Sequence, residues 1–302
     1  MENLEFVFPE IFVSLSIMFL LILGVFKKKG SKLILNLSLI ILLVTAVLTF
    51  NETIGINEIT LFNGSIIIDY LSSFMKIITL VAAFFVLVIS SNYLKSIKIF
   101  KIEYPILILS SVLGMMIMIS SNDLIVFYMG LELQSLALYV LATFNRDQIK
   151  SSEAGLKYFV LSALSSGLLL YGCSLIYGFT GSTNFNVIAN QLNSNEYALT
   201  FGIVFILVGL AFKISAVPFH MWAPDVYEGS PTSVTLFFTM VPKIAALTVF
   251  IRFLYVPFLN LIDQWQMILV FLSIASMVFG AVAAIGQKNI KRLIAYSSIG
   301  HI

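Results

Sequence analysis

Three ionisable residues stand inside stretches of sequence that are otherwise apolar: Glu132, Lys213 and Lys243. A charged side chain at the centre of a bilayer costs at least about 2.5 kcal/mol on insertion scales, so such residues usually mark routes for ions or protons. Burial lowers the pKa of a lysine and a nearby carboxylate raises it again, so a buried lysine and glutamate that approach and separate could bind and release a proton. Proton transfer inside a membrane is therefore the first chemistry that this sequence suggests.

Glu132 is the ninth residue of its apolar run, which begins at Leu124. At 1.5 Å per helical residue this places the carboxylate roughly 13 Å from the start of the helix, near the middle of a hydrocarbon layer about 30 Å thick. Two interpretations stay open. Glu132 is either part of a proton route, which we favour, or a structural carboxylate that hydrogen-bonds to a neighbouring helix.

Lys213 opens the run KISAVPFHMWAPDVYEGSPT, which occupies residues 213–232. Pro218 lacks a backbone N–H and disfavours helical geometry in the residue before it, so it frees carbonyl groups in or near the membrane. Freed carbonyls persist there only against protein or water. The run therefore predicts an interrupted, hydrated helix of the kind that transporters use. His220 either joins that path or is a helix-end histidine that makes one hydrogen bond.

The composition excludes a soluble globular protein. Hydrophobic residues make up 60% of the 302 positions, charged residues 11%, and the mean hydropathy is +1.03, whereas soluble domains have about 45–50% apolar and about 25% charged residues. The apolar runs are continuous, which indicates helices and not barrel strands. We predict an all-α, polytopic transmembrane helical bundle. Its nine complete spans are expected near residues 10–26, 32–49, 68–92, 105–120, 123–144, 155–178, 199–217, 232–255 and 264–285, and a tenth begins near residue 289.

Lysine and arginine cluster in every second connection, at residues 27–32, 95–101, 146–157 and 288–292. The positive-inside rule places these connections in the cytoplasm and the N-terminus outside. One connection on the same side does not follow the rule, because the turn after Lys213 carries Asp225 and Glu228 but no positive charge.

Several kinds of chemistry lack a site in this sequence. The single cysteine, Cys173, excludes an iron-sulfur cluster held within the chain and any internal disulfide. Glycine-rich dinucleotide motifs, a Walker loop and a His-Glu-x-x-His zinc motif are all missing. Redox chemistry, if the protein serves it, would take place on another chain.

Asp69 and Lys76 stand seven residues apart at the start of the third span, on one face of the expected helix. In one interpretation Asp69 caps the helix and Lys76 snorkels or pairs within the bundle; in the other, both orient a proton path. Arg252, near the end of the eighth span, is expected to snorkel to the membrane surface. The small residues of 162–167 indicate close helix packing, with serine hydroxyls free to bond across helices.

The 213–232 run, followed by Val241-Pro242-Lys243, resembles the antiporter-like membrane subunits of respiratory complex I, and their subunit N branch more than the L or M branches. The run GLELQS at residues 130–135 resembles the fifth-helix motif of the family, so Glu132 matches its glutamate. The resemblance covers the whole chain.

This resemblance implies an antiporter-like fold with two inverted five-helix repeats. Residues 1–103 would be N-terminal scaffold helices, residues 104–256 the first half-channel unit, and residues 257–302 the start of the second. We expect the chain to stop inside that second repeat, before a later lysine of the family. His301 would lie on the continuing hydrophilic axis.

By resemblance, the function is that of a proton-translocating subunit of an NADH:quinone oxidoreductase in a bacterial inner membrane. Glu132, Lys213 and Lys243 would transfer protons, with Glu132 in contact with Lys213. FMN, iron-sulfur clusters and quinone would bind to partner subunits and none of them to this chain. The expected partners are other complex I membrane subunits, antiporter-like ones included, together with lipid, protons and internal water. No nucleic acid is expected.

Two other functions remain open. A subunit of a multisubunit cation/proton antiporter would share the fold, but the sequence lacks the clustered oxygen ligands that suit a dehydrated cation. A passive structural subunit would not need ionisable residues in the middle of the membrane.

Overall fold

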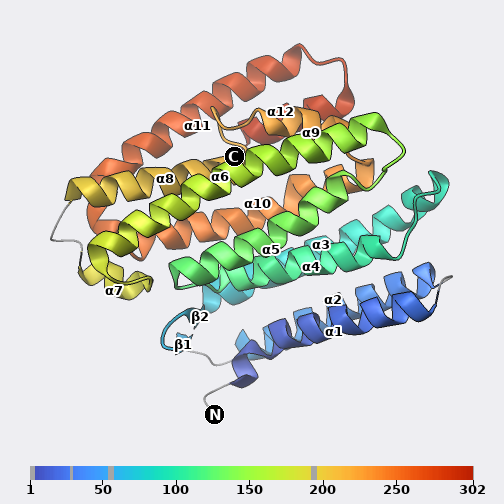
Figure 1. Cartoon of the computed structure of the whole chain (residues 1–302), viewed down its shortest axis with the longest axis horizontal. Coiled ribbons are helices and arrows are strands. Elements are labelled where there is room, and N and C mark those ends of the chain that lie inside the picture. Colours follow the sequence, from blue (N-terminus) through green and yellow to red (C-terminus); the bar gives the residue numbers. More distant parts are fainter. Residues whose placement is uncertain (1–3, 28–29, 54–57, 192–195, 302) are drawn as a thin grey trace.

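Helices dominate the structure, which is a computed structural model that describes residues 4–27, 30–53, 58–191 and 196–301. The all-α prediction is confirmed (Figure 1). The helical elements are η1 (Leu4–Val7), α1 (Phe8–Phe26), α2 (Ser31–Thr53), α3 (Tyr70–Ser96), α4 (Glu103–Ile119), α5 (Leu124–Ala142), α6 (Ile149–Thr180), α7 (Phe185–Asn190), α8 (Glu196–Ile214), α9 (Trp222–Gly229), α10 (Thr232–Tyr255), η3 (Leu259–Leu261), α11 (Ile262–Ile285) and α12 (Ile290–Gly300).

Each of the nine predicted spans corresponds to a helix among the described residues. Seven of these helices are long and apolar enough to cross a membrane, and two shorter apolar segments are α4, Glu103–Ile119, and the part of α8 from Ala198 to Ile214. Polar residues account for the end of α4, since Ser120 follows it and the Asp123 side chain then caps α5 by accepting from the backbone N–H of Ile125 at 2.8 Å. The chain is a multi-pass membrane protein.

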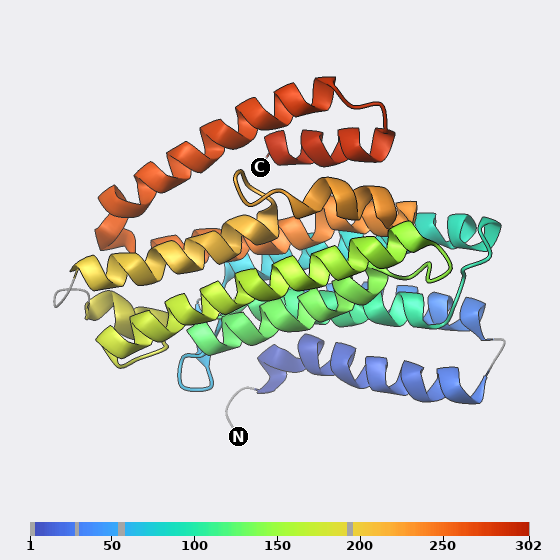
Figure 2. The same cartoon turned by 45° about the horizontal axis from the view of Figure 1, so that its top comes forward.

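The long helices lie side by side, and some of them approach closely through glycine (Figures 1 and 2). A Cβ atom on Gly114 of α4 would lie 2.5 Å from the backbone nitrogen of Gln134 in α5. A Cβ atom on Gly172 of α6 would lie 2.7 Å from the carbonyl oxygen of Gly202 in α8. Small residues of this kind let helix backbones touch in lipid. They pack α4 tightly against α5, and α6 tightly against α8.

A short β-hairpin between α2 and α3 was not foreseen by the all-α prediction. Strands β1 (Ile59–Leu61) and β2 (Ile66–Ile68) pair antiparallel. The backbone N–H of Ile67 donates to the carbonyl of Ser120 at 2.9 Å, and the Gly64 carbonyl accepts from the Asn122 and Asn184 side chains, each at 2.8 Å. The hairpin is therefore fixed to the end of α4 and to the start of α7.

Helices α1 and α2 lie at one edge of the bundle and α11 and α12 at the opposite edge (Figure 2). Along α11, large apolar side chains such as Phe271, Val278 and Val282 are exposed. Apolar side chains on an outer face suit lipid or neighbouring membrane helices.

Candidate functional site

The break after α8 begins at Ser215, before the proline that predicted it. Ser215 has a φ of 61°, and Ala216 donates its backbone N–H back to the Ala211 carbonyl at 2.8 Å, which closes the helix. Helical structure resumes only at Trp222, so the predicted interruption is confirmed. Pro218 lies within the break and is exposed.

Side chains form hydrogen bonds with backbone N–H and C=O groups that the break leaves without helical partners. The indole N–H of Trp222 donates to the Phe212 carbonyl at 2.9 Å, and the backbone N–H of Val217 donates to Ser276 Oγ of α11 at 2.9 Å. Unpaired backbone groups at membrane depth survive only with such partners. The break is thus a fixed part of the fold, held from both sides.

Lys213 ends α8 among three hydroxyl groups. Its Nζ donates to Ser135 Oγ of α5 at 2.8 Å and to Ser162 Oγ of α6 at 2.7 Å, with Tyr139 Oη at 3.5 Å. The Tyr139 ring also lies under the ammonium, 5.9 Å from Nζ to the ring centre. A lysine ammonium has three N–H donors and no acceptor. The hydroxyls of α5 and α6 therefore match the donors of Lys213.

The predicted direct contact between Glu132 and Lys213 is wrong. No ion pair joins the two side chains in the described structure, and Glu132 Oε1 is buried without a hydrogen-bond partner. The hydroxyl groups of α5 and α6 accept the hydrogen bonds of the ammonium group. Glu132 lies about one helical turn before Ser135 on α5, and one turn advances the backbone by about 5.4 Å along the helix axis.

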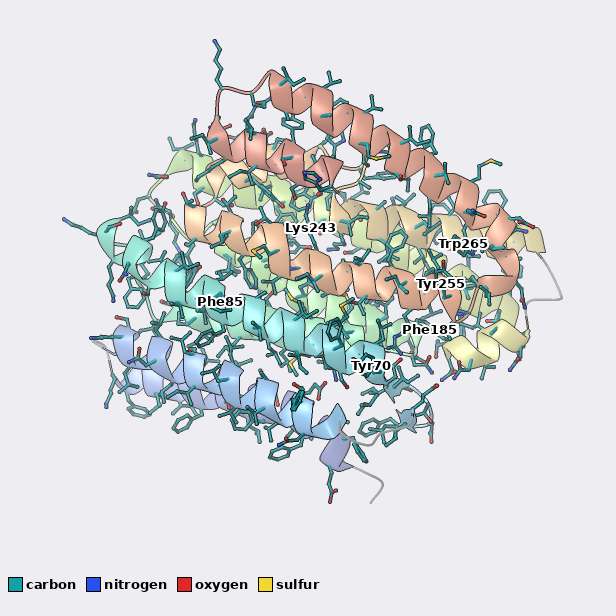
Figure 3. All side chains as sticks on the ribbon, turned by 180° about the vertical axis from the view of Figure 1, so that it is seen from behind. Tyr70, Phe85, Phe185, Lys243, Tyr255 and Trp265 are labelled. Atoms are coloured by element: carbon teal, nitrogen blue, oxygen red, sulfur yellow. The ribbon has the colours of Figure 1, made fainter. Side chains whose placement is uncertain are left out.

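Lys243 lies on α10 and contacts α12, as Figure 3 shows from behind. Its Nζ bonds to the Ser298 hydroxyl and lies 3.4 Å from the Ser298 carbonyl oxygen. A cavity of about 510 Å³ adjoins Lys243, and His301 at the end of α12 lines it. Ile214 lines the same cavity, directly after Lys213 in the chain. The end of α8 thus separates the two lysine sites.

His220 lies in the break and contacts α11. Its ring centre is 4.4 Å from that of Phe279, and its Nδ1 atom is buried without a hydrogen-bond partner. The structure brings it to neither lysine within hydrogen-bonding distance in the described residues. Its part in the path stays a prediction.

Asp69 and Lys76 have separate partners. Asp69 caps α3 through a capping box with Ser72 and accepts from Arg252 Nη2 at 2.7 Å. Burial would raise the pKa of Asp69, but the Arg252 charge and the hydrogen bond from the Ser72 N–H outweigh it, and the net shift is downward. Lys76 forms a buried ion pair with Glu10 of α1. The structure therefore fits the interpretation in which Asp69 caps the helix and Lys76 pairs within the bundle.

Arg252 does not snorkel, contrary to expectation. It is 4% exposed, and its guanidinium turns into the bundle toward the cap of α3. A charge-assisted bond to a carboxylate replaces the water that a snorkelling side chain would reach.

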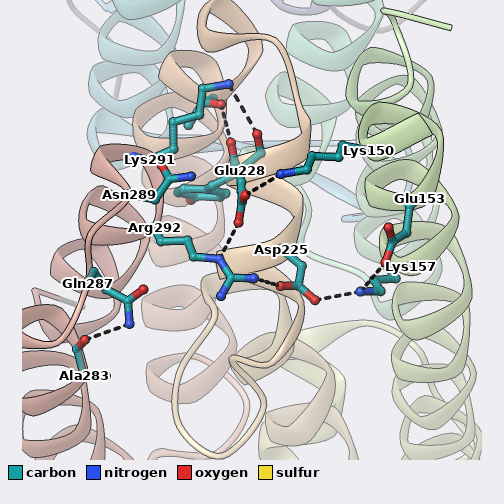
Figure 4. A network of polar contacts seen from close by, with 12 residues as sticks. Lys150, Glu153, Lys157, Asp225, Glu228, Ala283, Gln287, Asn289, Lys291 and Arg292 are labelled. Atoms are coloured by element: carbon teal, nitrogen blue, oxygen red, sulfur yellow. Dashed lines mark hydrogen bonds and ion pairs between the residues drawn. The ribbon is translucent and has the colours of Figure 1, made fainter. Parts of the chain in front are cut away.

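Charged side chains from α6 and α12 surround the two acidic residues of α9 (Figure 4). Arg292 Nη2 lies 2.6 Å from Asp225 and its Nε bonds to Glu228; Lys157 lies 2.8 Å from Asp225 and Lys150 lies 3.1 Å from Glu228. The hydrogen bond from Lys150 lowers the pKa of Glu228 against a smaller effect of burial, and Arg292 lowers it further. The α9 network consists of Asp225 and Glu228 of α9 with Lys150, Lys157 and Arg292.

The α9 network accounts for the one connection that did not follow the positive-inside pattern. The turn has no positive residue of its own, but Lys150, Lys157 and Arg292 reach it from two basic connections. The turn thus lies at the basic end of the bundle, as its place in the order of spans requires.

Sequence reasoning missed the hydroxyl partners of both lysines. Ser135 stands three residues after Glu132, a spacing that puts both on one helix face. Ser162 lies in a small-residue pattern that indicates packing, and Ser298 stands in the sequence only as a neighbour of His301. Glu10 gives no signal of burial, since a carboxylate at the first turn of a span resembles a surface residue.

Comparison with known proteins places the chain in a family. A family model described as "NADH:quinone oxidoreductase/Mrp antiporter, TM" matches residues 121–302. A protein of Pelagibacter ubique named NADH-quinone oxidoreductase subunit N is 74% identical over 302 residues, which is all of this chain and 64% of that protein. The chain thus spans less than two thirds of this relative's length.

Two solved structures show the same fold. A chain of respiratory complex I from Thermus thermophilus matches with a TM-score of 0.83 and 30% identity over 97% of this chain and 62% of that one. A chain of the Mrp complex from Dietzia matches with a TM-score of 0.84 and 22% identity over 99% of this chain and 57% of that one. The second likeness bears on the fold alone.

Proposed function

The chain belongs to the NADH:quinone oxidoreductase/Mrp antiporter transmembrane family, and from this premise we propose that it acts as subunit N of a bacterial NADH:quinone oxidoreductase and translocates protons. The name and identity of the Pelagibacter relative support the subunit assignment. The likeness to a chain of respiratory complex I from Thermus thermophilus supports the assembly. We further propose the bacterial inner membrane as its location, with the N-terminus outside.

The observation that carries the proposal is a pair of partly buried lysines, Lys213 just before a helix break and Lys243 on α10, which follows the break in the chain. Lys213 is held by hydroxyls of α5 and α6, and Lys243 by the Ser298 hydroxyl of α12. Ile214 lies beside both sites. A proton that leaves Lys213 would cross the end of α8 into the cavity beside Lys243, through water.

The distance of the Glu132 carboxylate from Lys213 would control whether Lys213 keeps or releases its proton. At an effective dielectric near 20, two charges about 8 Å apart attract by about 2 kcal/mol and two charges about 4 Å apart by about 4 kcal/mol. Moving one charge against about 150 mV takes about 3.5 kcal/mol. An approach of two such charges from about 8 Å to about 4 Å would supply about 2 kcal/mol, which is only part of this energy. Hydration of the Lys213 site must therefore change in the same step.

Electron transfer would take place on partner subunits that bind FMN, iron-sulfur clusters and quinone. The partners of this chain would include other membrane subunits of the complex. The three parts of the chain proposed from the sequence, residues 1–103, 104–256 and 257–302, would correspond to scaffold, first unit and start of the second unit.

A cation/proton antiporter subunit is the second candidate, favoured by the shared fold with the Mrp chain. The two functions differ in their assemblies. Purification of the full-length protein from its native membrane should bring iron-sulfur subunits with it if the oxidoreductase proposal is right, and antiporter subunits if it is not.

The test of proton transfer is Lys213→Ala in the full-length protein within its complex. We expect the complex to assemble and NADH-driven proton uptake by inverted membrane vesicles to be lost. Lys101→Ala, which removes an exposed lysine of a basic connection, is the control and should leave uptake unchanged. Full proton uptake by the Lys213→Ala complex would rule the role out.

A further inference from the structure

A second buried pair of opposite charges lies away from the two lysine sites. Glu10 in the first turn of α1 and Lys76 in the second turn of α3 form an ion pair, with side chains 10% and 2% exposed. Glu10 Oε1 is the acceptor, and Glu10 Oε2 is buried without a partner. Within the described residues Lys76 Nζ has this one acceptor for its three N–H donors. The pair is therefore only partly satisfied by protein.

A cavity of about 330 Å³ adjoins this pair, between α1, β2, α3 and α4. Most of its wall is apolar, including Phe62, Ile66 and Leu113. Ser120, the residue that ends α4, lines it as well, and Ser120 Oγ is also buried without a hydrogen-bond partner. Phe62 at the rim is exposed, so the cavity opens at the hairpin end of the bundle.

Water is the occupant that these groups fit. Buried polar atoms without a partner are rare because their desolvation is not compensated. A buried water molecule makes about three hydrogen bonds and takes about 30 Å³, so the cavity has room for several. Glu10 Oε2, Ser120 Oγ and the free N–H groups of Lys76 supply acceptors and donors for them. An acyl chain in the cavity would leave all of these groups unsatisfied.

We propose that this cavity is a water-filled proton-exchange site, in which Glu10 takes up and releases a proton at the hairpin end of the bundle. In the uptake step a hydronium ion gives its proton to Glu10 Oε2 and leaves as water, so that a neutral carboxyl group remains beside the Lys76 ammonium. Release reverses the step. Lys76 is the only other ionisable residue in the lining of the cavity among the described residues; β2 and α4 contribute none. This site goes beyond the proposed function and does not depend on it.

Hydration is tested with two serines of α4 in the full-length protein in its membrane, after Cys173→Ala removes the native cysteine of this chain. Ser120 and Ser111 are both buried with unpartnered hydroxyls, but only Ser120 lines the cavity. A thiol reacts as its thiolate, which forms where water can take the proton. We expect methyl methanethiosulfonate to modify Ser120→Cys at least about tenfold faster than Ser111→Cys.

Two outcomes of this labelling would overturn the proposal. Equally slow reaction of both cysteines would mean a dry cavity. Reaction of Ser120→Cys only after detergent extraction would mean that lipid fills the cavity in the membrane. Both variants leave the Glu10–Lys76 pair in place, so the test does not depend on the stability of a charge mutant.

Proton exchange is tested by infrared difference spectroscopy of the same protein between neutral and acidic pH. We expect a carboxylic acid C=O band that shifts at once in D₂O and is absent from Glu10→Gln. Glu58→Gln, which removes an exposed carboxylate at the same end, should keep the band. A spectrum unchanged by Glu10→Gln, or a Glu10 band that does not exchange in D₂O, would reduce the pair to a structural clamp.

Discussion

At the scale of single residues, the two lysines of the proposed path are held by hydroxyl groups. Ser135 and Ser162 accept from Lys213, and Ser298 accepts from Lys243. A hydroxyl has lone pairs to receive an ammonium and a rotatable proton to give to a neutral amine. Hydroxyl partners can therefore bind either protonation state of a lysine, which a carboxylate partner in a fixed ion pair cannot do as readily.

Ser162→Ala should weaken proton transfer, because it leaves a buried N–H of Lys213 without its acceptor. Loss of one partner of a buried hydrogen bond costs about 1–3 kcal/mol, so we expect proton uptake by vesicles to fall at least several-fold at an equal amount of complex. Ser166→Ala is the matched control: it removes another buried hydroxyl of α6, one that has no hydrogen-bond partner. Equal effects of the two changes would show that packing, and not the bond to Lys213, matters here.

The distance between Glu132 and Lys213 changes what their double mutant should show. Because no ion pair exists to be broken, Glu132→Gln should reduce proton uptake by no more than about 30-fold, which corresponds to about 2 kcal/mol and is less than the attraction of about 4 kcal/mol between two charges in contact. Lys213→Ala should abolish uptake, and the double variant should match it. Strictly additive losses in the double-mutant cycle would mean that the two residues act independently.

At this scale the sequence gives a distinct signal only where a charge stands alone in an apolar run. Glu132, Lys213 and Lys243 are conspicuous for that reason. Serine is common in membrane helices for packing alone, so Ser162 carried no distinct signal. Glu132 does not touch Lys213 because the hydroxyls of Ser135 and Ser162 already accept from the lysine's ammonium group.

At the scale of elements, α9 links the helices that hold the two lysines. Through the α9 network, α9 is bound to the first turns of α6 and of α12. Further along, α6 carries Ser162 and α12 carries Ser298, the hydroxyl partners of the two lysines. A displacement of α9 would therefore reach both lysine sites. Single ion pairs of this exposure contribute about 0–1 kcal/mol, so the link is adjustable and not rigid.

Arg292→Gln should loosen α12, since Arg292 bonds to both acidic residues of α9. We expect a loss of stability of about 1 kcal/mol, measured by thermal denaturation of the purified complex at low salt. The difference from the parent should shrink at about 1 M salt, which screens partly exposed charges. Lys288→Gln removes an exposed lysine of the same connection and should change nothing. An effect of Arg292→Gln that is independent of salt would speak against an ionic link.

Glu228 gives the α9 network a defined response to acid. Its pKa is lowered from 4.5, so its contribution to stability is fully present above pH 4.5 and is lost as the pH falls through the lower folded value. Thermal stability of the parent should therefore approach that of Glu228→Gln as the pH falls below 4.5 and exceed it at pH 7. A gap between the two that stays constant with pH would exclude ionisation of Glu228 as its source.

Helices were easier to predict than the structures between them. The spans follow from long apolar runs, and α10 begins and ends where the sequence predicts. Strands β1 and β2 have three residues each and lie in a connection between two spans, where no alternating pattern is long enough to be distinctive. The break after α8 was expected at Pro218, but the backbone already leaves the helix at Ser215.

At the scale of the whole molecule, charged residues divide the bundle into two different ends. The end with the α9 network holds the basic connections before α6 and α12. The hairpin end holds the buried pair Glu10–Lys76 and the partly buried pair Asp69–Arg252. Residues from helices far apart in sequence complete both ends. The charges of single connections therefore predict which connections share an end, but they do not predict the α9 network.

The proposed orientation puts the end with the α9 network in the cytoplasm and the hairpin end outside. Helices α2 and α3 are neighbours joined by the hairpin, so Ser31 at the start of α2 and Ser96 at the end of α3 lie at the same end of the bundle as the basic connections. In intact cells that carry the full-length protein without Cys173, an impermeant maleimide should leave Ser31→Cys and Ser96→Cys unlabelled until the membrane is opened. Asn186→Cys on α7, an exposed position at the hairpin end, should be labelled from outside. The reverse pattern would invert the proposed orientation, and with it the side from which Glu10 exchanges its proton.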